Sequence, residues 1–519
     1  MRLFDKTLLK VKKISRNNLY VNFLMILVII FWQLNGLGKT NFRLLKSTDQ
    51  QIQMLTSAKM YYFDYSSYEA AWNHHSPLIH SFYKIIYYIQ NFDSVTYGEY
   101  LLYTCFLIFV GVSIFTLLKT LTKNIPLSFI AALAFIFDIS SSTIGGKIFF
   151  DNRTLGIAFQ SLILVICFKY INSKKYNYLI ILSFVSTVLI YSLESYAASI
   201  GILFLYLFFN SEYKFNFVSC SVIGTFFAGV WITIHNYLNS DLRNLLDLNI
   251  FFHIESIGIA NNYEDVPISK ILDNFFINGA ELPFSGSLVT ITLLLLITFY
   301  IFFVKKFVNL NSYEKLLIVF LIGELLHLFL TGPRFLQYSQ TLLLPIYILF
   351  IISVFNICEL IFSSKKISNL LVSLILLIIF FAFQYGDVVN YRTSLIDGTF
   401  QETIDSYKPE TSEPQLVLTW IGIDKYESVF FENNSLPSTR LWWWHQMKYV
   451  DKFYDKNYKM FDDELLENVF IKDVKKERPK IAIIDTSIVS PPDYFLNYID
   501  KNFSLSKIEG ELKIYELNK

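Results

Sequence analysis

Long apolar runs, repeated along most of the chain, constrain its fold more than any other feature of the sequence. A transmembrane helix needs roughly 20 largely apolar residues, because every backbone polar group must be satisfied inside the segment. We expect about eleven such spans on this length criterion, starting near Leu19, Tyr100, Leu127, Leu155, Tyr178, Ile200, Phe217, Leu288, Leu316, Leu342 and Leu370. The basic segment 1–18 precedes an apolar run without a small-residue cleavage site, which predicts an uncleaved first span.

The composition agrees with a membrane protein. Only 17% of the 519 residues are charged and 54% are hydrophobic, whereas soluble domains carry about 25% charged residues. The net charge of +1 excludes a dedicated nucleic-acid binder, because such proteins need a basic excess to neutralise phosphates. The four cysteines each stand inside an apolar run and are interpreted as small core residues.

The distribution of lysine predicts the orientation of the chain. Short turns on one side are basic and therefore cytoplasmic by the positive-inside rule; they contain Lys119, Lys123, Lys174, Lys175, Lys214, Lys305, Lys306, Lys365 and Lys366. The segments expected outside are long or poor in basic residues: 37–98, 139–153, 237–285 and 331–337. We expect a multi-pass protein of the cell inner (cytoplasmic) membrane, with a cytoplasmic N-terminus and a periplasmic or extracellular C-terminal domain.

The chain changes character after residue 385. Apolar stretches shorten to strand length at 416–420, 481–485 and 513–517, and segment 462–474 has helical spacing. Alternating strands and helices predict a small α/β domain. The predicted fold class is therefore an α-helical polytopic membrane domain, 1–385, with a first outer loop at 37–98, followed by an extra-cytoplasmic α/β domain, 386–519.

The first outer loop is unusually long, about sixty residues where most connections have a few. Two amphipathic helices are expected in it, one after Thr48 or Asp49 and one after Pro77, and such helices can lie in the membrane interface. Asp49 could act as general base toward an acceptor hydroxyl, or serve as an N-cap. His74 and His75 cannot both reach one metal from a helix, so we expect contact with donor or acceptor instead of a zinc site.

Further charged residues stand at predicted outer ends of spans. Asp151 could hold a divalent cation while Lys147 and Arg153 bind a phosphate, or the three could simply pair with one another. Glu194 could line the same cavity or mark a turn. An ionisable residue near a span is a functional hypothesis because its burial is costly.

The last outer loop contains Arg334 followed by Tyr338. A single guanidinium there suits bidentate phosphate capture; the alternative is an interfacial anchor that reaches lipid head groups. Glu324 and His327 lie one helical turn apart, which suits a buried hydrogen bond or a metal pair. The aromatic run 442–445 could stack on a sugar face or pack the domain onto the membrane surface.

These residues resemble a known superfamily. Asp49, the run 73–78 (NHHSPL), Asp151 and the segment 332–345 (GPRFLQYSQTLLLP) are similar to motifs of GT-C polyprenyl-phosphate-sugar glycosyltransferases, closest to the protein-mannosyltransferase and aminoarabinose-transferase-like branch. In the tail, 436–440 and 478–481 resemble pieces of the family's outer domain. Two departures are visible: Gln50 follows Asp49 where many relatives have Asp-Glu, and no aspartate follows the tryptophans.

The resemblance implies transfer of one sugar, with inversion, from a polyprenyl-phosphate carrier to a lipid, glycan or protein acceptor on the outer face. Asp49 would be the base, Asp151 a supporting acid, and Arg334 a ligand of the donor phosphate. Because the lipid phosphate is already a good leaving group, a nucleotide-binding domain is not required, and the sequence contains no Gly-rich phosphate loop.

Two other functions remain as alternatives. A transporter or flippase for a lipid-linked glycan would be expected to show related halves, and the sequence shows no internal repeat. The other alternative is a non-catalytic assembly protein or a polymerase component of the cell envelope; a polymerase would be expected to carry its long loops, with several arginines, between later spans.

Overall fold

The computed structural model describes residues 19–34, 56, 59–60, 78, 81–82, 85, 95–141, 152–193, 196–239, 295–306, 309–331, 342–362, 415–422, 429–430, 435–439, 441–445 and 463–518. The chain divides into two compact units. The helical unit comprises Met1–Asn41, Tyr100–Trp231 and Tyr263–Arg392; the mixed unit comprises Phe42–Glu99, Ile232–Asn262 and Thr393–Lys519. The predicted boundary between 385 and 386 lies outside the described residues and stays a prediction.

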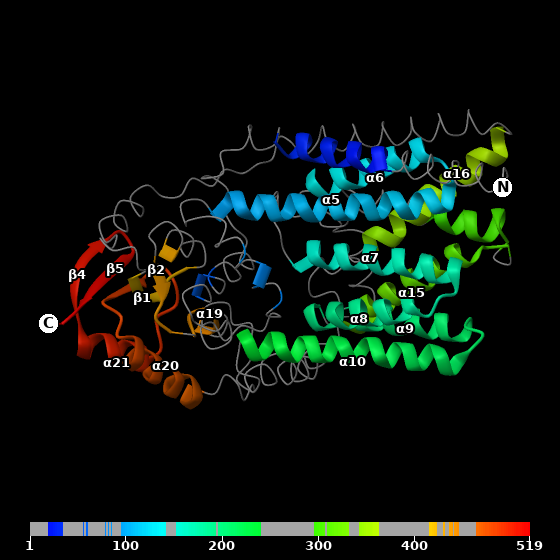
Figure 1. Ribbon diagram of the computed structural model, residues 1–519. Helices are drawn as coiled ribbons and strands as arrows, with labels where there is room; N and C mark the ends of the chain where they lie inside the picture. Colours follow the sequence, from blue (N-terminus) through cyan, green and yellow to red (C-terminus); the bar gives the residue numbers. More distant parts are fainter. Residues whose placement is uncertain are drawn as a thin grey trace. The chain divides into compact units, whose positions relative to one another are not determined.

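Apolar helices dominate the helical unit (Figure 1). After the helix Leu19–Leu34, the labelled helices are α5 (Val95–Thr122), α6 (Ile125–Ser141), α7 (Asn152–Ser173), α8 (Asn177–Ser192), α9 (Ala197–Phe209), α10 (Lys214–Asn239), the π-helix η5 (Tyr300–Val304), α15 (Ser312–Thr331) and α16 (Leu343–Phe362).

Four stretches within these helices are long and apolar enough to cross a membrane: Leu101–Thr122, Leu155–Ser173, Lys214–His235 and Leu343–Ile361. Shorter apolar helices cover Leu19–Leu34, Ile125–Phe137, Asn177–Ser192, Ala197–Phe209 and Leu295–Val304. The predicted polytopic helical class is thereby confirmed. The number of spans, about eleven on the length criterion, stays a prediction.

Small residues let neighbouring helices approach closely. A Cβ added at Gly224 of α10 would lie 2.2 Å from the carbonyl oxygen of Ile180 in α8. One added at Gly323 of α15 would lie 2.6 Å from the Cα of Ser199 in α9. Close backbone approach of this kind is a main source of helix association in lipid, where apolar burial between helices gains little.

Three of the helices end at a lysine in the left-handed region. Lys123, Lys174 and Lys306 have φ of 55°, 55° and 52°, and the N–H of Lys174 donates to the carbonyl of Tyr170 at 2.7 Å. A residue in this conformation closes the last helical turn and satisfies its free carbonyls. The basic residues that predicted the turns are therefore also residues that terminate helices.

The tail contains a five-stranded sheet with strand order β2-β1-β3-β5-β4. Its strands are β1 (Gln415–Trp420), β2 (Ser435–Pro437), β3 (Ile481–Asp485), β4 (Phe503–Glu509) and β5 (Leu512–Leu517). β1 pairs in parallel with β2 and β3, and β5 runs antiparallel to both β3 and β4. The strands predicted at 416–420, 481–485 and 513–517 are confirmed, and β2 and β4 are additions.

Three helices of the tail are described: the short α19 (Trp442–His445), α20 (Asp463–Glu477) and α21 (Asp493–Asn502). α20 confirms the helix predicted at 462–474; it has acids in its first turn and lysines in its last, which complements the helix dipole. Its buried residues include Leu466 and Phe470. Phe470 contacts the Phe495 ring of α21 with a centroid distance of 5.3 Å, so apolar burial joins the two helices.

Candidate functional site

Three basic turns of the helical unit lie at the same end of it. Phe168, near the end of α7, contacts the ring of Tyr313 in the first turn of α15 at a centroid distance of 4.6 Å. The Tyr206 hydroxyl of α9 donates to the carbonyl of Ser312 at 3.4 Å. Lys214, which begins α10, donates to carbonyls at the end of α9. The ends of α7 and α9 and the starts of α10 and α15 therefore meet.

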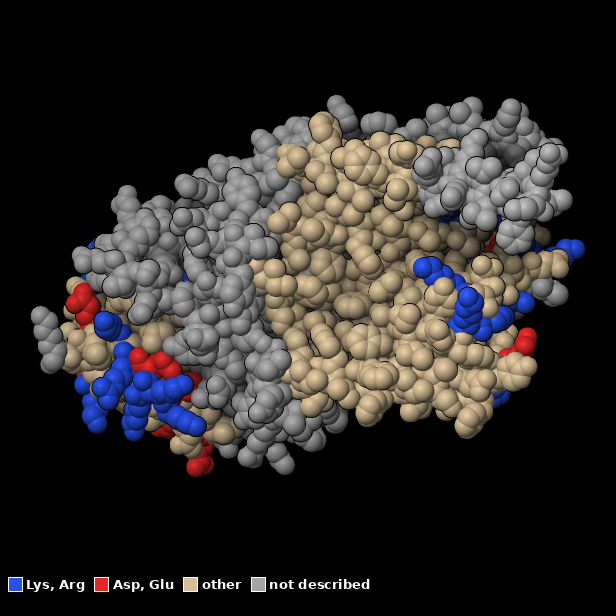
Figure 2. Space-filling view, in the orientation of Figure 1, with Lys and Arg blue, Asp and Glu red and all other residues tan. Residues whose placement is uncertain are grey.

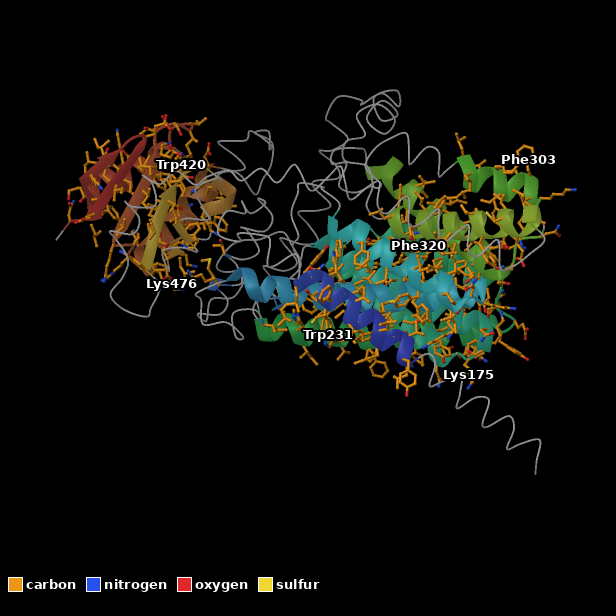
Figure 3. The ribbon with its side chains drawn as sticks, turned by 90° about the horizontal axis from the view of Figure 1, so that it is seen from above. Lys175, Trp231, Phe303, Phe320, Trp420 and Lys476 are labelled. Atoms are coloured by element: carbon orange, nitrogen blue, oxygen red, sulfur yellow. The ribbon has the colours of Figure 1, made fainter. Side chains whose placement is uncertain are left out.

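The figures agree with this arrangement. Lys175 and Phe303 lie toward one end of the helical unit, and Trp231, near the other end of α10, lies away from them (Figure 3). On the face in Figure 2, lysine and arginine of the helical unit gather at one end, and the rest of its described surface is uncharged. We define this as the basic end of the helical unit.

A capping box at the start of α15 organises the basic end. The side-chain oxygen of Asn311 accepts from the backbone N–H groups of Tyr313 at 3.0 Å and Glu314 at 2.9 Å. In return, Glu314 Oε2 accepts from the N–H of Asn311 at 2.8 Å. This reciprocal pairing satisfies donors that a helix start leaves free.

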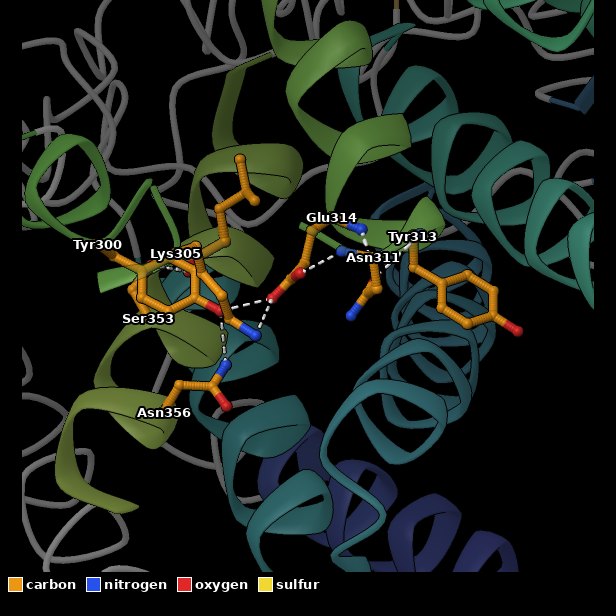
Figure 4. Close-up of polar contacts among 8 residues, drawn as sticks. Tyr300, Lys305, Asn311, Tyr313, Glu314, Ser353 and Asn356 are labelled. Carbon is orange, nitrogen blue, oxygen red and sulfur yellow. Dashed lines mark hydrogen bonds and ion pairs between the residues drawn. The ribbon is translucent and has the colours of Figure 1, made fainter. Parts of the chain in front are cut away.

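The second carboxylate oxygen of Glu314 extends the box into a buried network (Figure 4). The Tyr300 hydroxyl of η5 donates to Glu314 Oε1 at 2.5 Å, and the amide of Asn356 in α16 donates to that hydroxyl at 2.8 Å. Lys305 Nζ lies 3.7 Å from the same oxygen. The Glu314 side chain is only 1% exposed, so this carboxylate serves to join η5, α15 and α16.

The residues predicted to carry the chemistry lie outside the described part of the chain. This applies to Asp49, His74, His75, Lys147, Asp151, Glu194, Arg334 and Tyr338, and to the side chain of Arg153, of which only the backbone is described. Their roles and their proximity stay predictions.

Several of these residues stand next to a helix end in the sequence, and the structure describes those helix ends. Asp151 directly precedes α7, Glu194 follows α8, and Arg334 follows α15. α7 ends at the basic end, α8 begins in the next turn, and α15 begins there too. The start of α7 and the C-termini of α8 and α15 therefore lie away from the basic end, as the courses of these helices in Figure 1 also indicate.

Ser81 of the first loop contacts α10 near the C-terminal end of that helix. The Ser81 hydroxyl and His235 Nε2 are 2.8 Å apart, and both residues belong to the mixed unit. His235 lies near the C-terminal end of α10, whereas Lys214 begins that helix at the basic end.

Two of the alternatives left open by the sequence concern residues that are described. Trp442 is fully buried and contacts Phe430 at a ring centroid distance of 5.6 Å, so this tryptophan packs the core of the tail. Glu324 is buried in α15, and Gln160 of α7 donates to its Oε1 at 3.4 Å. Among the described residues, no group of three or more His, Cys, Asp or Glu is arranged to hold a metal ion.

Sequence reasoning missed two buried charged residues. The spacing of Asn311 and Glu314 carries a signal, since Asn followed three residues later by Glu is a helix-start pattern. Lys59 gave no comparable signal, although it proves to be 2% exposed and bonded to the tail. Its partners lie far away in the sequence, where no local pattern can indicate them.

The fold defines the class of the protein: a polytopic α-helical membrane protein with a small α/β unit at its C-terminal end. No family model and no curated protein sequence matches the chain. Among solved structures, it is similar to ArnT from Cupriavidus metallidurans bound to undecaprenyl phosphate. The two share 10% sequence identity and a TM-score of 0.49 over 96% of this chain and 97% of ArnT, a level at which the likeness carries no conclusion about activity.

Proposed function

We propose that this chain is an inverting membrane glycosyltransferase. It moves a single sugar from a polyprenyl-phosphate carrier to an acceptor of the cell envelope, on the outer face of the inner membrane. The proposal derives from the sequence motifs around Asp49, Asp151 and Arg334. It is supported by the described helices, because the helix ends that adjoin Asp151 and Arg334 in the sequence are remote from the basic end.

That separation is the observation that carries the proposal. The basic end of the helical unit joins turns that the positive-inside rule assigns to the cytoplasm. The helix ends that adjoin Asp151, Glu194 and Arg334 in the sequence are the opposite ends. This arrangement supports the proposal that these three residues share one outer cavity, which Asp49 of the first loop would complete.

In the proposed reaction, the Asp49 carboxylate takes the proton of the acceptor hydroxyl as its oxygen attacks the anomeric carbon. The bond between that carbon and the phosphate oxygen breaks, and the polyprenyl phosphate leaves with the bonding electron pair. Arg334, with Tyr338, Lys147 and Arg153, binds the departing phosphate and stabilises its charge. Asp151 is a second, supporting acid of the site, and His74, His75 and Glu194 line the cavity.

A divalent cation is a possible further component, but its ligands would come from Asp49 and Asp151, which lie outside the described residues. Gln50 follows Asp49, so the chain does not offer the adjacent acid pair. The proposed steps therefore use only side chains of the protein.

Replacement of the proposed base tests the function. We expect Asp49→Asn to lower sugar transfer by at least about 100-fold, since a general base contributes about 10²–10⁴-fold. The measurement is formation of the new glycosidic bond, by mass spectrometry of envelope glycans, in membranes supplied with polyprenyl-phosphate sugar.

Asp500→Asn is the matched control, because Asp500 is exposed on α21 and should leave transfer unchanged. Transfer at the normal rate by well-expressed Asp49→Asn protein would exclude Asp49 as the base. If the wild-type chain moves lipid-linked sugar across vesicles without forming a glycosidic bond, the protein is a transporter and the proposal is wrong.

A further inference from the structure

Lys59 of the first loop is buried in the mixed unit, although lysine is among the residues least often buried. Only 2% of its surface is exposed. Its amine donates to the carbonyl oxygens of Phe430 at 2.6 Å and Ser435 at 3.1 Å. These acceptors are more than 370 positions away in the sequence, so the bonds join the first loop to the tail.

Both acceptors belong to rigid parts of the tail. The Phe430 side chain is fully buried in a cluster that also contains Trp442 and Ile483. Ser435 begins β2, which pairs in parallel with β1 at the edge of the sheet. The two carbonyls are thus held by the core and by the sheet, and they form a fixed receptor for a donor on the first loop.

Apolar contacts accompany the two hydrogen bonds. Met60, adjacent to Lys59, forms a buried cluster with Leu436 of β2, and Leu416 of β1 packs against it. Thr56, also helical, is fully buried. The described residues around Lys59 therefore bury one face of a helical segment on the edge of the sheet.

The chemistry of the amine suits this receptor. Burial lowers the pKa of Lys59 to about 7, because removal from water disfavours the charged form. A neutral amine has two N–H donors, the same number as the carbonyls that accept from it. The anchor therefore persists whether or not the amine carries its third proton.

We propose that Lys59 is a positioning residue, which anchors the first loop on the carbonyl groups of Phe430 and Ser435 and so holds the segment that carries Asp49 in its reacting position. The inference depends on the proposed function and assigns a task to the C-terminal unit within it: the tail is the support on which the catalytic loop is fixed.

The length of the loop explains why such an anchor is needed. A connection of about sixty residues between two helices samples many arrangements, and a base displaced by about 1 Å can lose about 100-fold in rate. The described contacts fix this loop at two points, Lys59 on the tail and Ser81 on His235. Each of these two contacts divides the long loop into shorter loops, whose closure costs less conformational entropy.

The test compares Lys59→Met with Lys501→Met in the full-length protein. Methionine is unbranched, one atom shorter than lysine and without a donor, and Lys501 is an exposed lysine of α21. We expect Lys59→Met to raise amide hydrogen exchange about tenfold or more in both 56–60 and 429–436, and to lower kcat for sugar transfer about 10- to 100-fold. KM for the polyprenyl-phosphate sugar should change less than about twofold, because uniform donor binding is untouched.

Lys59→Gln keeps two N–H donors and should retain much of the exchange protection and of kcat, which serves if Lys59→Met fails to fold. Unchanged exchange in Lys59→Met would overturn the anchor, and raised exchange with a normal kcat would overturn its positioning role. A wild-type chain that transfers no sugar would refute the proposed function and with it the positioning role, whereas the exchange measurement would still decide whether Lys59 anchors the loop.

Discussion

The helical unit and the sheet of the mixed unit use aromatic side chains in opposite ways. Phe215 and Phe303 in the helical unit are 82% and 71% exposed, whereas Phe470, Phe495 and Trp442 around the sheet are fully buried. Aromatic surface that faces outward is expected where lipid surrounds a helix, and it is costly where water does. The same residue type therefore stabilises the two regions by different means.

This difference teaches where the stability of each region resides. Around the sheet, burial of large side chains away from water is the main favourable term. Between the helices, lipid is as apolar as leucine, so close packing and buried hydrogen bonds must hold the helices together. Gly224, Gly323 and the Glu314 network are features of this second kind.

The largest expected effect comes from removal of an aromatic side chain next to the sheet. Phe470→Ala should lower the free energy of unfolding by about 3–5 kcal/mol, since it deletes a fully buried ring and leaves a cavity. Phe303→Ala, a matched change at an exposed position, should change it by about 0.5 kcal/mol or less. Denaturant titration in detergent measures both; equal losses would contradict the contrast between the regions.

A smaller effect is expected from an added methyl group between two helices. Gly224→Ala would bring a Cβ to 2.2 Å from the Ile180 carbonyl oxygen, and the required backbone shift should cost about 1–3 kcal/mol. Gly201→Ala is the control, because a Cβ there meets nothing within 4 Å and alanine favours the helix by up to about 1 kcal/mol. Unfolding by a denaturing detergent in mixed micelles would show opposite signs, and a stabilised Gly224→Ala protein would refute the close approach.

The extent to which the fold was predictable also differs between strands of one sheet. The apolar segments that became β1, β3 and β5 were correctly predicted. The side chains of β1 and β3 are largely buried, and β5 alternates buried and half-buried positions over its first four residues, so the sequence reflects each pattern. β2 has only three residues and includes Pro437, and in β4 residues 504–508 are exposed. β2 is too short to show a period, and the apolar–polar alternation that begins β4 is broken by a register shift between Leu505 and Lys507. Pairing with neighbouring strands therefore defines both.

For the candidate site, the sequence indicates which residue types are present and on which side of the membrane each segment is expected. Contacts between distant segments come only from the structure. The basic turns predicted from Lys174, Lys214 and Lys305 identify one end of the helical unit through short-range patterns. The anchor of Lys59 depends on a separation of 371 positions from Phe430, beyond any spacing rule. The roles assigned to Asp49 and Arg334 stay predictions.

A third expected effect is a pH dependence that arises in the sheet-containing unit. The amine of Lys59 has a folded-state pKa of about 7, against an ordinary value of 10.5. Between these values the unfolded chain binds the proton and the folded chain does not, so the free energy of unfolding should rise with pH. The slope of the free energy of unfolding against pH approaches about 1.4 kcal/mol per pH unit above pH 7 and falls to zero below it.

The difference between wild type and Lys59→Met isolates this contribution, because the other titrating groups are common to both proteins. Denaturant titrations at pH 6, 7, 8 and 9 should give a constant difference up to about pH 7 and then a growing advantage of the wild type. The same series with Lys501→Met is the control at an exposed lysine. A difference that stays constant from pH 6 to pH 9 would mean that the folded protein holds Lys59 as an ammonium ion throughout, and the burial of a neutral amine would have to be abandoned.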